Sequence, residues 1–138
     1  MHYIPIYQVV LKRLGSLRTE QRQFRHSRDA AELLRQYLSD VDREHFVVCA
    51  LNRKNRVIGL HTVSIGSLTA SVVHPREVLK FLILSNASAC ILGHNHPSGD
   101  VQPSSEDRAL TVRLQQAARI HGIAILDHII LATAATAT

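Results

Sequence analysis

Several residue types that normally mark a functional site or a covalent scaffold are scarce in this sequence. Tryptophan is absent, and the 138 residues include only three phenylalanines and three tyrosines. The two cysteines, Cys49 and Cys90, lie inside apolar runs, as buried structural thiols usually do. The cysteine content therefore argues against a disulfide scaffold and against a Cys-x-x-Cys metal site.

Long apolar stretches are missing as well. A helix that crosses a bilayer needs about 20 consecutive apolar residues, and no run in this sequence approaches that length. Residues 1–14 also lack the compact apolar core and the small-residue cleavage site of a secretory signal peptide. We therefore expect a cytoplasmic protein that makes no contact with a membrane.

Positive charge exceeds negative charge, and much of the excess lies near the N-terminus. The net charge is +5 and the pI is near 9.8. Arginines recur at positions 13, 18, 22, 25 and 28, whereas aromatic side chains that could stack on bases are scarce in the whole sequence. We interpret this segment as a solvated face, with weak contact to nucleic acid or to an acidic partner as the alternative.

The length and the ordinary balance of 46% hydrophobic and 20% charged residues predict one domain with one core. Residues 1–26 are irregular and polar and are expected to be a lead-in segment. Residues 27–131 should form the domain, and the Ala/Thr-rich residues 132–138 should form a tail.

Hydrophobic periodicity predicts three helices, over residues 27–39, 75–86 and 104–121. Ser27 is expected to cap the first helix, and Pro75 suits the first turn of the second. Apolar runs at 46–51 and 57–65, separated by a polar turn, predict an antiparallel hairpin, and further strands are expected at 88–93 and 123–131. These elements indicate an α/β fold in which helices cover a mixed sheet.

The segment from His94 to Asp107 carries the residues suited to chemistry. In extended backbone His94 and His96 point to the same side, and Asp107 is expected on the inward face in the first turn of the third helix. Two imidazoles and one carboxylate suit zinc and leave a fourth position open, as in catalytic sites where the pKa of a bound water falls to roughly 7. Iron or manganese could also occupy such a site. Alternatively, Ser104 and Asp107 form only a helix cap beside two ordinary histidines.

The pattern His94-x-His96, seven residues, Ser104, two residues, Asp107 resembles the JAMM (MPN+) metalloprotease motif. The surrounding sequence resembles the RadC branch of that family. The matching segments are Gly66-Ser67-Leu68, His74-Pro75-Arg76-Glu77-Val78, Asn95-His96-Pro97-Ser98-Gly99-Asp100, Pro103-Ser104 and Leu126-Asp127-His128. This resemblance implies an MPN (JAB)-like, cytidine-deaminase-like fold. It also implies that His94, His96 and Asp107 are zinc ligands and that Ser104 stabilises an oxyanion.

The sequence departs from the family pattern in two places. JAMM proteins carry an acid/base glutamate on an earlier strand, but His61 occupies the expected position and no acidic residue lies between Glu44 and Glu77. His61 could take over proton transfer, bind the metal or simply pack. RadC proteins also usually carry an N-terminal helix-hairpin-helix region that suggests DNA contact, and we find none in these residues.

Two functions follow from the resemblance. The first is a zinc-dependent hydrolase of the JAMM type, a metallopeptidase or isopeptidase-like enzyme that acts on a peptide or protein. The second is a zinc-bearing but catalytically silent RadC-type module in DNA metabolism, which the missing glutamate and the basic lead-in favour. His74, His121 and His128 have no partners at ligand spacing and are interpreted as surface or internally satisfied histidines.

Overall fold

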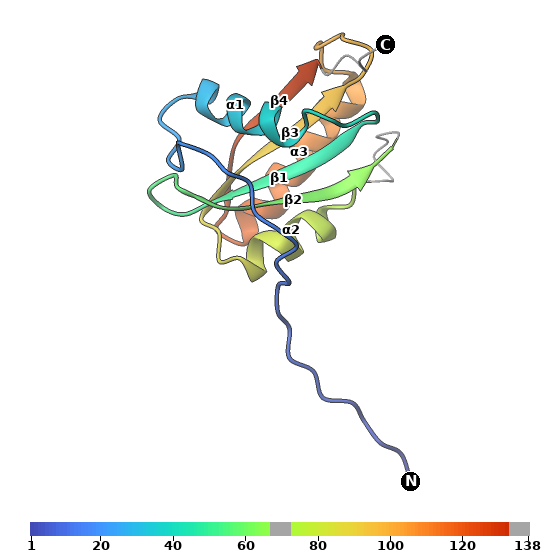
Figure 1. Ribbon diagram of the computed structural model, residues 1–138. Coiled ribbons are helices and arrows are strands. Elements are labelled where there is room, and N and C mark those ends of the chain that lie inside the picture. Colours follow the sequence, from blue (N-terminus) through green and yellow to red (C-terminus); the bar gives the residue numbers. More distant parts are fainter. Residues whose placement is uncertain (67–72, 133–138) are drawn as a thin grey trace.

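The computed structural model describes residues 1–66 and 73–132, which form a four-stranded sheet with helices on both faces (Figure 1). The elements are α1 (Ser27–Tyr37), β1 (His45–Leu51), β2 (Val57–Ile65), α2 (Pro75–Leu84), β3 (Ala89–His96), α3 (Ser105–Ile120) and β4 (Ala124–Ala132). Their spatial order in the sheet is β2-β1-β3-β4. β1 is antiparallel to β2 and to β3, whereas β3 and β4 run parallel. The predicted mixed α/β fold is confirmed.

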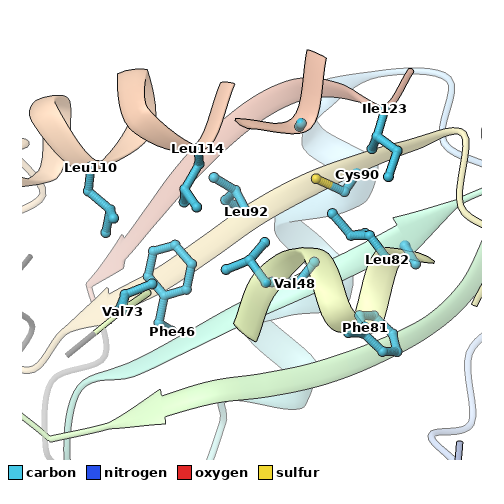
Figure 2. Close-up of a cluster of buried hydrophobic side chains, with 13 residues drawn as sticks. Phe46, Val48, Val73, Phe81, Leu82, Cys90, Leu92, Leu110, Leu114 and Ile123 are labelled. Atoms are coloured by element: carbon cyan, nitrogen blue, oxygen red, sulfur yellow. The ribbon is translucent and has the colours of Figure 1, made fainter. Parts of the chain in front are cut away.

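Alternating side chains of β1 divide the core into two layers. One layer packs under α2 and α3 and includes Phe46, Val48, Leu92, Leu110 and Leu114 (Figure 2). The other lies under α1, whose Leu33 and Leu34 pack against the opposite alternate residues of β1. Because both faces of β1 are covered, six of its seven residues are buried. Its sequence is therefore a continuous apolar run rather than an alternation of apolar and polar residues.

The predicted starts of α1 and α2 agree with the structure, and the other helix ends differ from the predictions by one or two residues. Capping explains the start of α3 and differs from the prediction in α1. α3 begins at Ser105 because Ser104 is its N-cap. α1 was expected to be capped by Ser27, but His26 occupies the cap position, and the Asp29 carboxylate accepts hydrogen bonds from the backbone N–H groups of Arg25 and His26. The expected Ser27 cap is therefore wrong, and the Asp29 carboxylate instead binds backbone donors that precede the helix.

β3 extends three residues beyond its predicted end at Gly93. It continues to His96 because β4 pairs with it in parallel register up to His96–Ala132. His94 and His96 therefore lie within the strand rather than after it, and the ladder to β4 fixes their backbone.

The lead-in segment runs away from the sheet and helices in the blue part of Figure 1. Residues 1–18 are exposed, including large apolar side chains such as Ile4, Ile6 and Leu14. The segment joins the fold where Val57 N–H donates to the Arg22 carbonyl and Phe24 N–H donates to the Asn55 carbonyl. No helix within residues 1–66 and 73–132 has the length and apolar character needed to cross a membrane. Residues 133–138 of the predicted tail, and Ser67 and Leu68 of the matching text, lie outside the described residues.

Candidate metal centre

The structure brings His94, His96 and Asp107 together at the junction of β3 and α3, as a group that could hold a metal ion. The Nε2 atoms of the two histidines are 2.8 Å apart. His94 Nε2 is 3.4 Å from Asp107 Oδ1, and His96 Nε2 is 3.6 Å from Asp107 Oδ2. Ligand atoms bonded to one tetrahedral zinc at about 2.0–2.1 Å would lie about 3.3 Å apart, so small adjustments would fit the three atoms around one ion.

A capping box at the start of α3 holds the Asp107 carboxylate in this position. The Ser104 hydroxyl oxygen accepts from the Asp107 N–H at 3.0 Å, and Asp107 Oδ2 accepts from the Ser104 N–H at 2.8 Å. Asp107 can therefore form the helix cap with Ser104 and face the two histidines in the same conformation. The helix-cap interpretation and the metal-ligand interpretation of Asp107 are compatible.

Hydrogen bonding determines which nitrogen of His96 carries its proton. His96 Nδ1 lies 2.6 Å from the Asp100 carbonyl oxygen, which can only accept. A neutral His96 therefore carries its proton on Nδ1, and its Nε2 presents a lone pair to His94 and Asp107. His94 Nε2 lies 2.8 Å from His96 Nε2, close enough for one cation to be bound by both nitrogens.

His94 lies at the buried end of the group and is fully inaccessible to solvent. Its ring stacks on Phe46 with centroids 6.0 Å apart, and its Nδ1 lies 2.8 Å from His128 Nε2. Burial, aided by the nearby His128, lowers the pKa of His94 to about 4 although Asp107 acts in the opposite direction. The imidazole is therefore neutral at physiological pH, the form in which histidine binds metals.

The carboxylate of Asp107 is ionised in spite of its burial. Burial alone would raise the pKa of this group, but the hydrogen bonds from Ser104 and the neighbouring histidines outweigh it and lower the pKa below the ordinary value. The site thus combines one anionic oxygen donor with two imidazole nitrogen donors.

His61 lies on β2, two strands away from the metal-binding group. It pairs with Val48, which pairs in turn with Leu92, two residues before His94. Its ring lies 5.1 Å from the ring of Phe81 on α2. Burial and, to a lesser extent, Lys80 lower its pKa. In the same register, Ser64 lies opposite Phe46, which pairs with His94.

Two residues beside the site were not identified as functional from the sequence. His128 was interpreted as a surface or internally satisfied histidine, and it is internally satisfied: its Nε2 contacts His94 Nδ1 and its Nδ1 contacts the Thr111 hydroxyl. Asn95 joins β3 to the start of β1 and to the loop before it, because its side chain accepts from His45 N–H and donates to the Arg43 carbonyl. The dipeptide Asp127-His128 was visible in the sequence, but its position beside His94 depends on the pairing of β3 with β4.

A surface cavity of about 520 Å³ adjoins the metal-binding group. Its polar lining includes Asp107, Thr111 and His128. The remaining lining is mainly apolar with one cation, and consists of Val101, Pro103, Arg108, Val112 and Ile130. The cavity gives a ligand direct access to the Asp107 end of the group.

Comparison with known proteins agrees with this geometry. Residues 24–137 match the model of the RadC-like JAB domain. The chain is 52% identical over 103 residues to a UPF0758 protein of Rubrobacter xylanophilus, covering 75% of this chain and 45% of that protein. It is 50% identical over 121 residues to a UPF0758 protein of Desulforamulus reducens, covering 87% and 53% respectively. The chain spans about half the length of these relatives. A model match over most of the chain and two relatives at about 50% identity lead to one conclusion: the chain belongs to the RadC-like JAB domain family.

Proposed function

We propose that this chain is a zinc-dependent hydrolase of the JAMM type, a metallopeptidase or isopeptidase-like enzyme, in which His94, His96 and Asp107 hold the metal. The convergence of the three ligand atoms beside an open cavity is the observation that carries this proposal. Two neutral imidazoles and one carboxylate form a donor set that zinc accepts, and three protein ligands leave a coordination position for chemistry. A zinc ion held by these residues would supply a Lewis acid and an activated water for the hydrolysis of an amide.

Ser104 is suited to stabilise an oxyanion without giving up its cap. Its hydroxyl oxygen accepts a hydrogen bond from the Asp107 N–H, which leaves the hydroxyl hydrogen available to donate. A hydroxyl at the first turn of α3 also lies in the positive end of the helix dipole, which favours developing negative charge nearby.

The cavity supports a peptide or protein substrate. Its apolar lining would accept an aliphatic side chain next to the scissile bond, and Arg108 would attract a carboxylate or a carbonyl oxygen. We therefore expect cleavage after or before an apolar residue rather than within a purely charged sequence.

The metal content of the purified chain, measured by elemental mass spectrometry, tests the metal role. We expect about one zinc per chain, and loss of that zinc in both His94→Ala and Asp107→Ala. A folded wild-type chain without any bound metal after zinc loading would refute the proposal. The zinc-loaded chain should then hydrolyse members of a fluorogenic peptide library, and Asp107→Ala should abolish this activity.

A specific observation favours a second function, a zinc-bearing but catalytically silent module in DNA metabolism. β2 carries no acidic residue, and His61 packs against Phe81 on α2 instead of making a described contact with the three ligand residues. The exposed arginines of the lead-in segment would supply weak contact with nucleic acid.

The substitution His61→Glu separates the two functions. If the zinc-loaded wild type is inactive and His61→Glu gains hydrolysis that Asp107→Ala removes, the silent module is the correct function and only one group is missing. If the wild type hydrolyses peptides and His61→Ala retains that activity, proton transfer by His61 is excluded.

A further inference from the structure

We propose that Thr111 and His128 act as a positioning relay that decides which nitrogen of His94 carries its proton, and thereby keeps Nε2 of His94 free for the metal. This inference rests on the proposed metal role of His94. The relay is a line of three hydrogen bonds that starts at the Asp107 backbone carbonyl and ends at His94 Nδ1.

The first step of the relay is fixed by the single hydrogen of the Thr111 hydroxyl. Thr111 Oγ1 lies 2.9 Å from the Asp107 carbonyl oxygen, four residues earlier in α3. A carbonyl can only accept, so the hydroxyl donates its hydrogen there. Towards His128 Nδ1, its other close partner, Thr111 Oγ1 can then only accept.

The second step transfers this constraint through His128. Because Nδ1 of His128 donates to Thr111, the neutral ring carries its proton on Nδ1 and has a lone pair on Nε2. That Nε2 lies 2.8 Å from His94 Nδ1. His94 must therefore donate from Nδ1, which leaves its lone pair on Nε2.

Nε2 is the atom of His94 that faces the other two ligand residues. It lies 2.8 Å from His96 Nε2 and 3.4 Å from Asp107 Oδ1. A proton on this nitrogen must leave before a metal can bind there, so the choice of tautomer affects the metal affinity of the group.

Packing makes the relay rigid. Phe46 lies under both rings, stacked on His94 and edge-on to His128 with centroids 5.5 Å apart. His94 is fully buried, so water cannot replace a lost partner at its Nδ1 without a change in packing. Asp107 thus acts at both ends: its carboxylate faces the metal position and its carbonyl anchors the relay.

Removal of the Thr111 hydroxyl should release the constraint. His128 could then carry its proton on Nε2 and donate to His94 Nδ1, which would force the proton of His94 onto Nε2. Outer partners of metal-binding histidines typically contribute a factor of about 10–100 in metal affinity, and we expect a loss of this size in Thr111→Val.

The experiment compares Thr111→Val with Thr111→Ser, which retains the hydroxyl, and with the control Thr62→Val. Thr62 is bonded to Tyr37 under α1, on the opposite face of the sheet. Zinc affinity is measured by competition with a chromophoric chelator. The histidine tautomers of the metal-free chain are measured at pH 8 from long-range proton–nitrogen NMR correlations. We expect His94 to carry its proton on Nδ1 in the wild type, in Thr111→Ser and in Thr62→Val, and only Thr111→Val to lose affinity.

Two results would overturn the relay: a proton on Nε2 of His94 in the wild type, or unchanged affinity and tautomer in Thr111→Val. If the wild type binds no zinc but its His94 tautomer changes in Thr111→Val, the relay stands and the proposed metal function fails. If Thr111→Val does not fold, the His94 tautomer and the zinc affinity are measured in His128→Gln and His128→Leu instead. A Gln amide can accept from His94 and donate to Thr111, so only the Leu variant should lose the tautomer.

Discussion

At the scale of single residues, the two thiols are held in a form that resists reaction. Cys49 lies in the core layer under α1 and Cys90 in the layer under α2 and α3, and both are completely buried. Burial raises the pKa of each thiol to about 12. Because the thiolate is the reactive form, neither cysteine should react in the folded chain.

We therefore expect no reaction with a chromogenic aromatic disulfide at pH 8 in buffer, and two thiols per chain in guanidinium chloride. Rapid reaction of one thiol in buffer would contradict the buried positions.

The raised pKa of the two thiols also predicts how the free energy of unfolding depends on pH in the alkaline range. Above about pH 9 the unfolded chain loses thiol protons that the folded chain retains, so the free energy of unfolding should fall as pH rises.

The convergence of His94, His96 and Asp107 was predictable from the sequence because its signal is local. Two histidines at spacing two on a strand, followed by an aspartate in the first turn of a helix, need little tertiary information to be placed together. His128 could not be placed in this way, because its contact with His94 spans 34 residues and depends on the β3–β4 register. The role expected for His61 stays a prediction.

At the scale of secondary-structure elements, Gly93 allows α1 to lie against β3 next to the strand end that carries His94 and His96. A Cβ atom at this position would lie 2.6 Å from Leu34 Cδ1 of α1, and Leu34 is itself buried. Gly93→Ala should therefore lower the free energy of unfolding by about 1–3 kcal/mol through overpacking.

Urea denaturation measures this effect, and Gly15→Ala is the matched control because a Cβ there would meet no atom within 4 Å. In a double-mutant cycle, Leu34→Ala should remove most of the additional cost of Gly93→Ala, since it removes the contact. Additive effects of the two substitutions would show that the close approach of α1 is not the cause.

The start of α3 supplies a second prediction at this scale. Ser104→Ala removes the hydroxyl that accepts from the Asp107 N–H and should cost about 1 kcal/mol of stability. Chemical denaturation of the metal-free chain measures this cost apart from any effect on catalysis. Ser105→Ala, one residue into the helix, should leave stability nearly unchanged, and an equal loss in both variants would argue against the capping box.

Helix and strand types were predictable from periodicity, whereas their ends depended on contacts that the sequence hides. β3 continues beyond its apolar residues because β4 pairs with it up to His96. Polar residues such as Asn95 are therefore buried inside a strand. The N-cap of α1 is His26 rather than Ser27, and the Asp29 carboxylate inside the helix binds the backbone N–H groups of Arg25 and His26.

At the scale of the whole molecule, residues 1–17 contribute exposed surface and no described contact to the core. Side chains such as Tyr3, Ile6 and Val9 are exposed, and the first contact with the domain is made by the Arg18 carbonyl, which accepts from Gln36. Deletion of residues 1–17 should leave the midpoint of thermal unfolding unchanged and should reduce self-association driven by exposed apolar side chains.

Differential scanning calorimetry and light scattering after size-exclusion chromatography measure the two effects. Deletion of residues 1–24 is the comparison, because it also removes the backbone bonds to Asn55 and Val57 and the buried Phe24. Only this longer deletion should lower the midpoint. A lower midpoint in the shorter deletion would show that the lead-in segment packs on the domain.

The two imidazoles lie on one central strand that is bonded on both sides, whereas the carboxylate lies on the first turn of a helix. Separating the histidines from each other would require rupture of two β-ladders, but a helix end opens by local fraying at far lower cost. Escape of a bound ion should therefore begin at Asp107, and its residence time should follow the opening rate of a single helical turn rather than the rate of global unfolding.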